Sequence, residues 1–138
     1  EQSVPSTASY LAVIEIPKIS LYTGIVMSNT SYTTIDRNVS IYPTSDMPNI
    51  KNGNFILFAH NGNSRVSYFK NIYKLKNNDE IYIYYNNIKY TYRIIKNYEV
   101  AMTDRTPLNK MDQSIITLIT CKSGNDKYRT IVVGEMIE

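Results

Sequence analysis

The chain has 138 residues and a mass of 15.9 kDa, which is the size of a single globular domain. With 43% hydrophobic and 20% charged residues, it does not have the composition of a disordered or low-complexity chain. The formal net charge is +3, and the basic residues are scattered rather than gathered in a stripe, which argues against nucleic-acid binding. The single cysteine, Cys121, excludes an intramolecular disulfide, and together with the single histidine, His60, it excludes the common zinc sites.

No apolar run approaches the ~20 residues of a transmembrane helix, and the first ten residues do not resemble a signal peptide. Residues 1–9 are polar and contain a proline, so we expect a flexible tail followed by one domain over residues 10–138. Because the sequence begins at Glu1 rather than at a methionine, we expect it to have been trimmed. Any membrane anchor would then precede it.

In the first half of the chain, apolar runs of strand length alternate with turn-forming residues. Strands are predicted at 11–16 and 20–26, and Gly24 predicts a bulge or bend in the second of them. Residues 27–52 are rich in Ser, Asn and Thr and are predicted to be mostly loop, whereas the nearly continuous apolar run at 54–59 predicts a central strand buried on both faces.

The second half begins with apolar residues at helical spacing over 66–75, which predict a short helix. Two alternating, tyrosine-rich runs follow and meet at Asn86-Asn87, a pattern that predicts a hairpin. The segments that come after it are a sheet extension at 98–100, a loop at about 102–113, a strand at 114–120, a loop at 122–127 and a strand at 128–137. About eight short strands with little helix predict an all-β barrel or closed sandwich.

Three residues, His60, Cys121 and Arg129, fall at predicted strand ends beside polar loops. Such positions let a rigid scaffold hold a reactive group that still reaches solvent. A cysteine nucleophile acts as its thiolate, which a nearby imidazolium or guanidinium favours, and acyl transfer needs a fixed donor for the oxyanion. Each residue also has a structural explanation: a buried thiol, a hydrogen-bonded histidine and a solvated arginine.

The local sequence motifs around these residues favour the catalytic interpretation. Residues 117–121, Thr-Leu-Ile-Thr-Cys, match the Thr-Leu-x-Thr-Cys signature of the sortase family. Arg129 opens Arg-Thr-Ile-Val-Val-Gly, which resembles the strand that carries the sortase arginine, and residues 58–61 resemble the motif of the sortase histidine. Residues 14–19 are similar to the opening strand of the family. The resemblance covers nearly the whole chain from about residue 10.

Sortases are Gram-positive cell-surface cysteine transpeptidases with an eight-stranded closed β-barrel. The resemblance implies that Cys121 attacks the Thr carbonyl of a Leu-Pro-x-Thr-Gly-like motif and forms a thioacyl enzyme. It further implies that His60 transfers protons, that Arg129 holds the oxyanion or the substrate backbone, and that Thr120 helps to line the substrate groove or the oxyanion site. In the loop at 102–113, Thr106, Pro107 and Leu108 are predicted substrate contacts.

The resemblance also implies the partners: secreted proteins that carry a sorting motif, and an amine of a cell-wall precursor or of a pilin. The enzyme would act at the extracellular face of the membrane, without a cofactor; calcium modulation stays open, although no acidic cluster suggests a site. The eight-residue separation of Cys121 and Arg129 is typical of class B, whereas the compact N-terminus is more typical of classes A, D or E. No pilin-type lid motif is present in residues 1–10.

Two other functions remain open on the sequence alone. The thirteen tyrosines, many of them alternating through 82–98, could serve a non-catalytic cell-surface binding module in which Cys121 is buried. A hydrolytic cysteine peptidase would use the same nucleophile but release its acyl group to water.

Overall fold

We describe the protein from a computed structural model, which covers residues 10–27, 39–59, 68–122 and 125–137; the side chains of residues 121, 122, 125 and 126 are not included. Eight strands and three short 3-10 helices make up these residues. They are β1 (Ala12–Ile16), η1 (Pro17–Ile19), β2 (Leu21–Met27), β3 (Val39–Ile41), β4 (Asn54–Phe58), η2 (Ile72–Lys74), β5 (Glu80–Tyr85), β6 (Ile88–Ala101), η3 (Thr106–Leu108), β7 (Ile115–Lys122) and β8 (Asn125–Met136).

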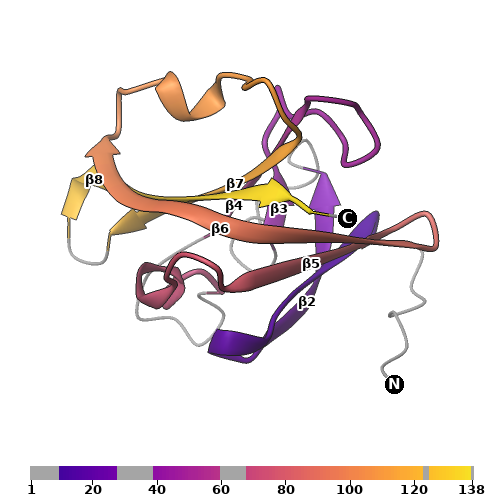
Figure 1. Cartoon of the computed structure of the whole chain (residues 1–138). Coiled ribbons are helices and arrows are strands. Elements are labelled where there is room, and N and C mark those ends of the chain that lie inside the picture. The colour runs from indigo at the N-terminus through magenta and orange to yellow at the C-terminus, as the bar shows by residue number, and fades with distance from the viewer. Residues whose placement is uncertain (1–9, 28–38, 60–67, 123–124, 138) are drawn as a thin grey trace.

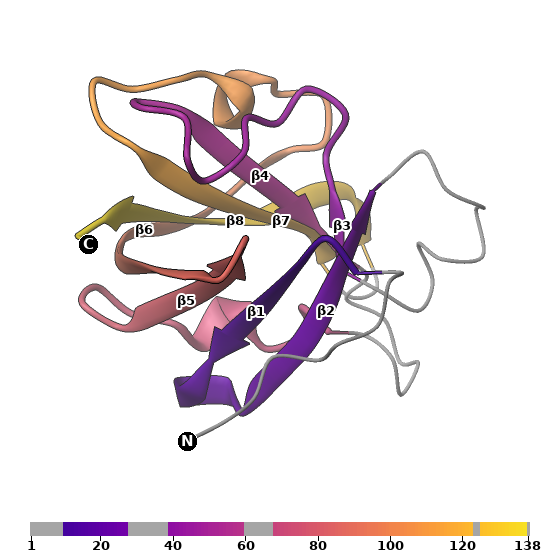
Figure 2. The ribbon, with the colours of Figure 1, turned by 90° about the vertical axis from the view of Figure 1, so that its right-hand side faces the viewer.

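The strands form one closed barrel in the order β1-β2-β3-β4-β7-β8-β6-β5, which β1 closes by pairing with β5 (Figures 1 and 2). The pairs β2–β3 and β4–β7 are parallel, and the other pairs are antiparallel. The parallel β4–β7 pair joins segments that lie about sixty residues apart in the chain. This pairing brings the C-terminal ends of β4 and β7 to the same end of the barrel.

Two apolar clusters hold the barrel together. The larger one fills the interior, and Phe55, Phe69 and Tyr92 are its largest fully buried side chains. The smaller one lies on the other face of β4, β7 and β8, with Ile56, Ile115, Ile119, Ile131 and Val133 at its centre. Leu108 of η3 packs against this second cluster. The segment between β6 and β7 therefore covers the outer face of the sheet, where it is seen above the strands in Figure 1.

The all-β barrel predicted from the sequence is confirmed, as are the two-faced burial of β4 and the hairpin. The hairpin turn has Asn86 and Asn87 at φ values of 51° and 65°. Two successive left-handed residues are what a two-residue turn needs to match the twist of its strands. The segment 98–100 belongs to the single long strand β6, whose register against β8 shifts between Ile94 and Lys96.

Four predictions were wrong in detail. The loop at 27–52 contains β3, a strand of only three residues. Over 68–75, the described part of the predicted helix, the chain forms turns and the 3-10 helix η2 instead of an α-helix. Strand β8 begins at Asn125, inside the predicted 122–127 loop. Gly24 pairs with Val13 in an unbroken register, so it forms no bulge; the Tyr10 ring occupies the place of its missing Cβ.

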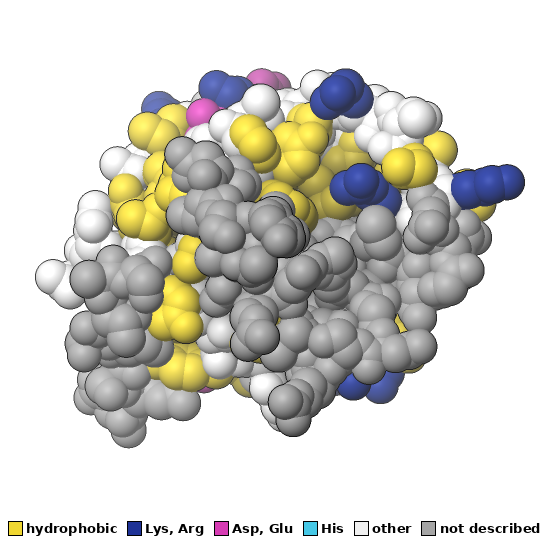
Figure 3. All heavy atoms as spheres, turned by 180° about the vertical axis from the view of Figure 1, so that it is seen from behind, with side chains coloured by type: hydrophobic (Ala, Val, Ile, Leu, Met, Phe, Trp, Pro, Cys, Tyr) yellow, Lys and Arg dark blue, Asp and Glu magenta, His cyan; other side chains and the backbone are white. Residues whose placement is uncertain are grey.

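The described residues include no helix that is long and apolar enough to span a membrane. Viewed from behind, their Lys and Arg side chains lie apart from one another rather than in one patch (Figure 3). Residues 1–9, for which a flexible tail was predicted, lie outside the described part of the chain.

Candidate active site

The backbone pairing of β7 and β8 brings two of the three candidate residues together. Cys121 is the direct partner of Arg129 in the antiparallel ladder. Directly paired residues in such a ladder have Cα atoms about 4.5–5.5 Å apart. The register shifts immediately after this pair, between Cys121 and Lys122, so the ladder becomes irregular at the proposed nucleophile. Bulges of this kind are common beside active sites because they re-aim a side chain.

The third candidate, His60, lies outside the described residues, but the residue before it is fixed to the same place. The backbone N–H of Ala59 donates to the carbonyl oxygen of Ile119 at 3.2 Å. The buried hydroxyl of Thr120 donates to the carbonyl oxygen of Ala59 at 2.7 Å. The residues that immediately precede His60 and Cys121 are therefore bonded to each other, across a separation of 61 positions in the chain.

Arg129 is half-buried, and its Nε atom is fully buried. Among the described residues this nitrogen has no hydrogen-bond partner. A buried donor of a charged group that stays unpaired costs free energy, on the order of 1–3 kcal/mol or more. The arginine is thus held with one N–H available to an acceptor from outside the described structure.

Beside Arg129 lies a cavity of about 410 Å³. Its floor is apolar and comes from β7 and β8, where the cross-strand pair Ile119 and Ile131 precedes the Cys121–Arg129 pair by two positions in the ladder. Successive side chains of a strand alternate between faces, so the two pairs occupy positions of the same parity. The other described lining residues are Tyr42, Val100, Met102, Thr103, Asp104, Arg105, Pro107 and Leu108.

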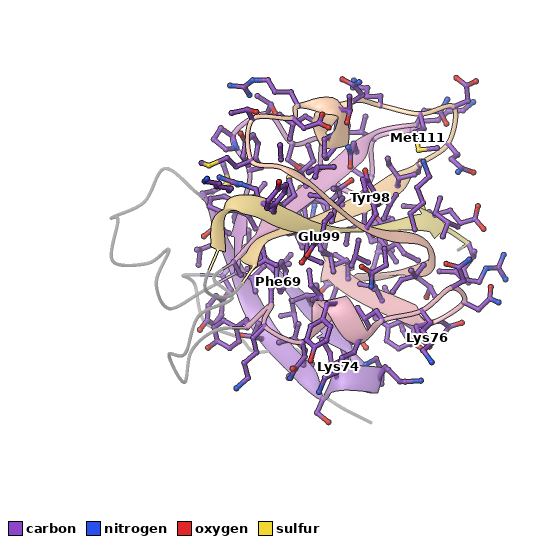
Figure 4. All side chains as sticks on the ribbon, turned by 90° about the vertical axis from the view of Figure 1, so that its left-hand side faces the viewer. Phe69, Lys74, Lys76, Tyr98, Glu99 and Met111 are labelled. Carbon is purple, nitrogen blue, oxygen red and sulfur yellow. The ribbon has the colours of Figure 1, made fainter. Side chains whose placement is uncertain are left out.

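The segment between β6 and β7 forms much of the cavity wall and is fixed by its own polar contacts. Asp104 accepts hydrogen bonds from the backbone N–H of Thr106 at 2.9 Å and from the hydroxyl of Thr106 at 2.7 Å. These two bonds, the backbone one first, lower the pKa of the Asp104 carboxyl group. Burial, followed by the charge of Asp104, raises the pKa of Tyr98 on β6. Figure 4 shows Tyr98 on β6 and Met111 in this segment itself.

A family model of the sortase domain matches residues 14–137, which is nearly the whole chain. The chain belongs to the sortase family. Members of this family are cysteine transpeptidases. The catalytic roles expected of Cys121 and Arg129, which the ladder pairs directly, stay predictions. No three His, Cys, Asp or Glu side chains gather into a possible metal site in the part of this sortase that the structure describes.

Individual sortases resemble the chain over most of its length. Sortase A of Bacillus anthracis is 30% identical over 125 residues, which is 90% of this chain but 58% of that relative. The crystal structure of sortase C-1 from Actinomyces oris has a TM-score of 0.87 at 26% identity, over 94% of this chain and 75% of that one. A Clostridium perfringens sortase D5 transpeptidase has a TM-score of 0.79 at 29% identity, over 94% and 79%. These sortases belong to classes A, C and D, so the resemblance leaves the class open.

The four residues that were predicted to contact substrate do not all line the same cavity. Pro107 and Leu108 line the cavity beside Arg129. Thr106 lines a smaller cavity of about 220 Å³ on the other side of η3, and Pro107 borders both. Thr120 lines neither cavity; its side chain is 2% exposed and bonded to Ala59. Its contact with substrate stays a prediction, and its observed bond joins β7 to Ala59, the residue before His60.

Sequence reasoning missed two residues near the cavity. Tyr42 lines it from the segment after β3 and packs edge-on against Phe58, with ring centroids 5.7 Å apart. Asn54 does not line the cavity but donates a hydrogen bond to the carbonyl oxygen of Pro107 in its wall. Tyr42 lay in a predicted loop, and Asn54 was predicted only as the first residue of the strand at 54–59, so neither carried a local signal of its role. Their roles depend on contacts with segments far away in the chain.

Proposed function

We propose that this chain is the catalytic domain of a sortase transpeptidase that cleaves a Leu-Pro-x-Thr-Gly-like sorting motif between Thr and Gly and transfers the acyl part to an amine. The observation that supports this most directly is the pairing of Cys121 with Arg129, one position beyond the Thr120–Ala59 bond, beside an apolar cavity. This pairing would bring the proposed nucleophile and the proposed oxyanion donor together next to Ala59, the residue before His60.

In the proposed first step, the thiolate of Cys121 attacks the Thr carbonyl carbon, and a tetrahedral oxyanion forms. The C–N bond to Gly then breaks, His60 donates its proton to the leaving amine, and a thioester remains on Cys121. In the second step an incoming amine attacks the thioester, His60 accepts a proton from it, the C–S bond breaks and the thiolate is restored. Thiolate and imidazolium must exist together, so a bell-shaped pH–rate profile is expected, with apparent pKa values that belong to the pair.

Arg129 would donate to the oxyanion or to the carbonyl groups of the bound motif. Its buried Nε, which has no partner among the described residues, supports this role, because a donor held in a water-poor site stabilises a developing charge more than one in bulk water does. Cys121 directly opposite in the ladder sets the separation, since the two backbones are neighbours.

The cavity beside Arg129 would receive the Leu-Pro part of the motif. Its floor of Ile119 and Ile131 and its wall of Pro107 and Leu108 offer apolar contacts to these two side chains. Apolar pockets with a few fixed polar groups are the usual form of a small-ligand site. Thr106 and Thr120 complete the proposed set of substrate contacts.

Transfer rather than hydrolysis is proposed because a thioester reacts well with an amine held close to it. The acceptor would be a peptide amine of the cell-wall precursor or a pilin lysine, and the donors would be secreted proteins of a Gram-positive cell. The site would then face the extracellular side of the membrane, and the reaction as written requires no cofactor.

The proposal is tested with a quenched sorting-motif peptide, with and without triglycine. Cleavage that yields a triglycine-linked product supports transfer; cleavage to the free acid alone would indicate a peptidase, and no cleavage would favour a binding module. Cys121→Ala, His60→Ala and Arg129→Ala should each lower turnover at least a thousandfold while the barrel stays folded by circular dichroism.

A matched arginine control is Arg93→Ala. Arg93 lies on β6, is 44% exposed and forms an ion pair with Glu135 at 3.3 Å. Its removal should change turnover less than twofold. Full activity in any of the three site variants would contradict the role given to that residue.

A further inference from the structure

A single buried amide joins the barrel to the wall of the cavity. Asn54, the first residue of β4, is 1% exposed. Its Nδ2 donates to the carbonyl oxygen of Pro107 at 3.0 Å and to that of Asn109 at 3.0 Å. Its Oδ1 accepts from the hydroxyl of Thr117 at 2.7 Å. One side chain thus links β4, β7 and the two sides of η3.

This amide has no donor left over. An asparagine side chain carries two N–H donors, and here each of them binds one carbonyl oxygen of the η3 region. Because carbonyl oxygens can only accept, these two bonds fix which way the amide points. The Thr117 hydroxyl, of a fully buried residue, then donates to the remaining Oδ1. In a site of low dielectric, such bonds are stronger than on the surface, and losing them leaves buried carbonyl groups unpaired.

The segment held by Asn54 supplies most of the cavity wall. Residues 102–108 contribute six lining residues: Met102, Thr103, Asp104, Arg105, Pro107 and Leu108. Behind η3 lies the smaller cavity of about 220 Å³, which Pro107 also borders. With open space on both sides of η3, its position depends on polar contacts as well as on the packing of Leu108. Another polar contact of this segment among the described residues is the ion pair of Lys110 with Asp46 at 3.6 Å, and it is weak because Lys110 is 64% exposed.

We propose that Asn54 is a positioning residue that holds η3 in place and thereby sets the affinity of this cavity for the sorting peptide. The inference rests on the proposed function, because it assigns the cavity to the peptide that donates the acyl group. It predicts that loss of the amide raises the KM for the peptide and leaves kcat and the KM for the amine nearly unchanged, because the binding lost is common to the ground state and the transition state.

The chain contains a matched control at another place on the barrel. The Nδ2 of Asn97, on β6, donates to the carbonyl oxygens of Ile72, Tyr73 and Leu75 at 3.2, 3.1 and 2.7 Å. This clamp fixes η2, which lies on the opposite side of the molecule from η3 in Figure 1; Figure 4 labels its last residue, Lys74. None of its residues lines the cavity. Asn97→Ala therefore removes a similar clamp without touching the proposed substrate wall.

The experiment compares Asn54→Ala, Thr117→Val and Asn97→Ala with the parent. Turnover is measured with varied sorting peptide at fixed triglycine and then the reverse. Asn54→Ala should raise the peptide KM at least tenfold and change the triglycine KM less than twofold. Thr117→Val keeps the shape of the side chain and removes only the hydroxyl that binds the amide oxygen of Asn54. It should raise the peptide KM two- to fivefold. This variant allows the inference to be tested even if Asn54→Ala does not fold. Asn97→Ala should change neither constant.

Amide hydrogen exchange provides a second measurement that does not depend on activity. The N–H groups of Leu108 and Asn109 close η3, at 3.0 and 3.1 Å from their acceptors, and those of Lys74 and Leu75 close η2. Asn54→Ala should speed exchange at least tenfold in η3 and not in η2, and Asn97→Ala should do the opposite. Faster exchange in η3 with an unchanged peptide KM would overturn the inference, and so would an equal rise of the peptide KM in both alanine variants. A parent protein that does not turn over the peptide would instead overturn the proposed function, and the inference with it.

Discussion

Thr120→Val removes one hydroxyl from the bond that joins β7 to the end of β4. Thr120 is 2% exposed, and its hydroxyl lies 2.7 Å from the carbonyl oxygen of Ala59. Valine has nearly the same shape, so no cavity forms and the main loss is the hydrogen bond. A buried acceptor left without this partner costs about 1–2 kcal/mol, part of which valine recovers through its preference for strands. For a chain of this length we expect the melting temperature to fall by about 3–8 °C.

The effect on turnover should be larger than the effect on stability. A domain with about 5–15 kcal/mol of stability remains almost fully folded after such a loss. Any fall in kcat/KM at 25 °C therefore reports the geometry of the site and not the folded fraction. Because the bond lies one residue before both His60 and Cys121, we expect kcat/KM for a sorting peptide to fall at least tenfold, since displacements of about 1 Å can cost about a hundredfold.

The matched control is Thr130→Val. Thr130 is the direct cross-strand partner of Thr120 and is 4% exposed, but it lies on β8 rather than beside β4. It should change kcat/KM less than threefold. If Thr120→Val shows the expected loss of stability but retains parental kcat/KM, the bond to Ala59 does not align the two catalytic residues, and the reasoning is refuted.

Three further outcomes can be measured. Gly24→Ala places a methyl group where the Tyr10 ring lies and should cost about 1–3 kcal/mol in urea unfolding; the cost should shrink when Tyr10→Ala is added, and an equal cost in both backgrounds would contradict the clash. Lys110→Ala should lower stability by no more than about 0.5 kcal/mol, with a smaller difference in 1 M salt, because the ion pair with Asp46 is exposed. Burial and a hydrogen-bonded carboxylate raise the pKa of Tyr84 to about 12. Since this folded-state value lies above the unfolded value of about 10, the contribution of the phenol to stability is complete below pH 10 and is lost as the pH rises toward 12. Tyr84→Phe should therefore reduce the fall in stability over that interval, and an unchanged fall would exclude this phenol as its source.

The sequence predicted the elements whose signals are local. The hairpin at Asn86-Asn87 and the apolar strand β4 could be recognised because a turn residue pair and an unbroken apolar run act within a few residues. Strand β3 has only three residues and is stabilised by pairing with β2 and β4, which no local pattern reveals. Gly24 illustrates a second limit. Its lack of a side chain is required by the close approach of the Tyr10 ring and not by the bend that a glycine in a strand commonly indicates.

The same distinction applies to the site. The motifs identified Cys121 and Arg129, and the ladder pairs these two residues directly. Pro107 and Leu108 line a cavity beside Arg129, and their contact with substrate stays a prediction. Asn54 could not be found in this way, because its partners Pro107 and Thr117 lie 53 and 63 residues away. A buried amide becomes visible as a structural element only when the segments that it connects are placed in space.

The parallel pairing of β4 with β7 has a consequence for the order of events during folding. Its contacts bridge about sixty residues, and β8 must then enter between β7 and β6 before the ring of strands is complete. Contacts of such long range form late, since the entropy of closing the intervening chain must be overcome first. The Cys121–Arg129 pair lies in the local hairpin of β7 and β8 and can form early, whereas Ala59, the residue before His60, reaches β7 only through the long-range pairing. A partly folded chain is therefore expected to carry an inactive cysteine and to gain its reactivity in one step with barrel closure.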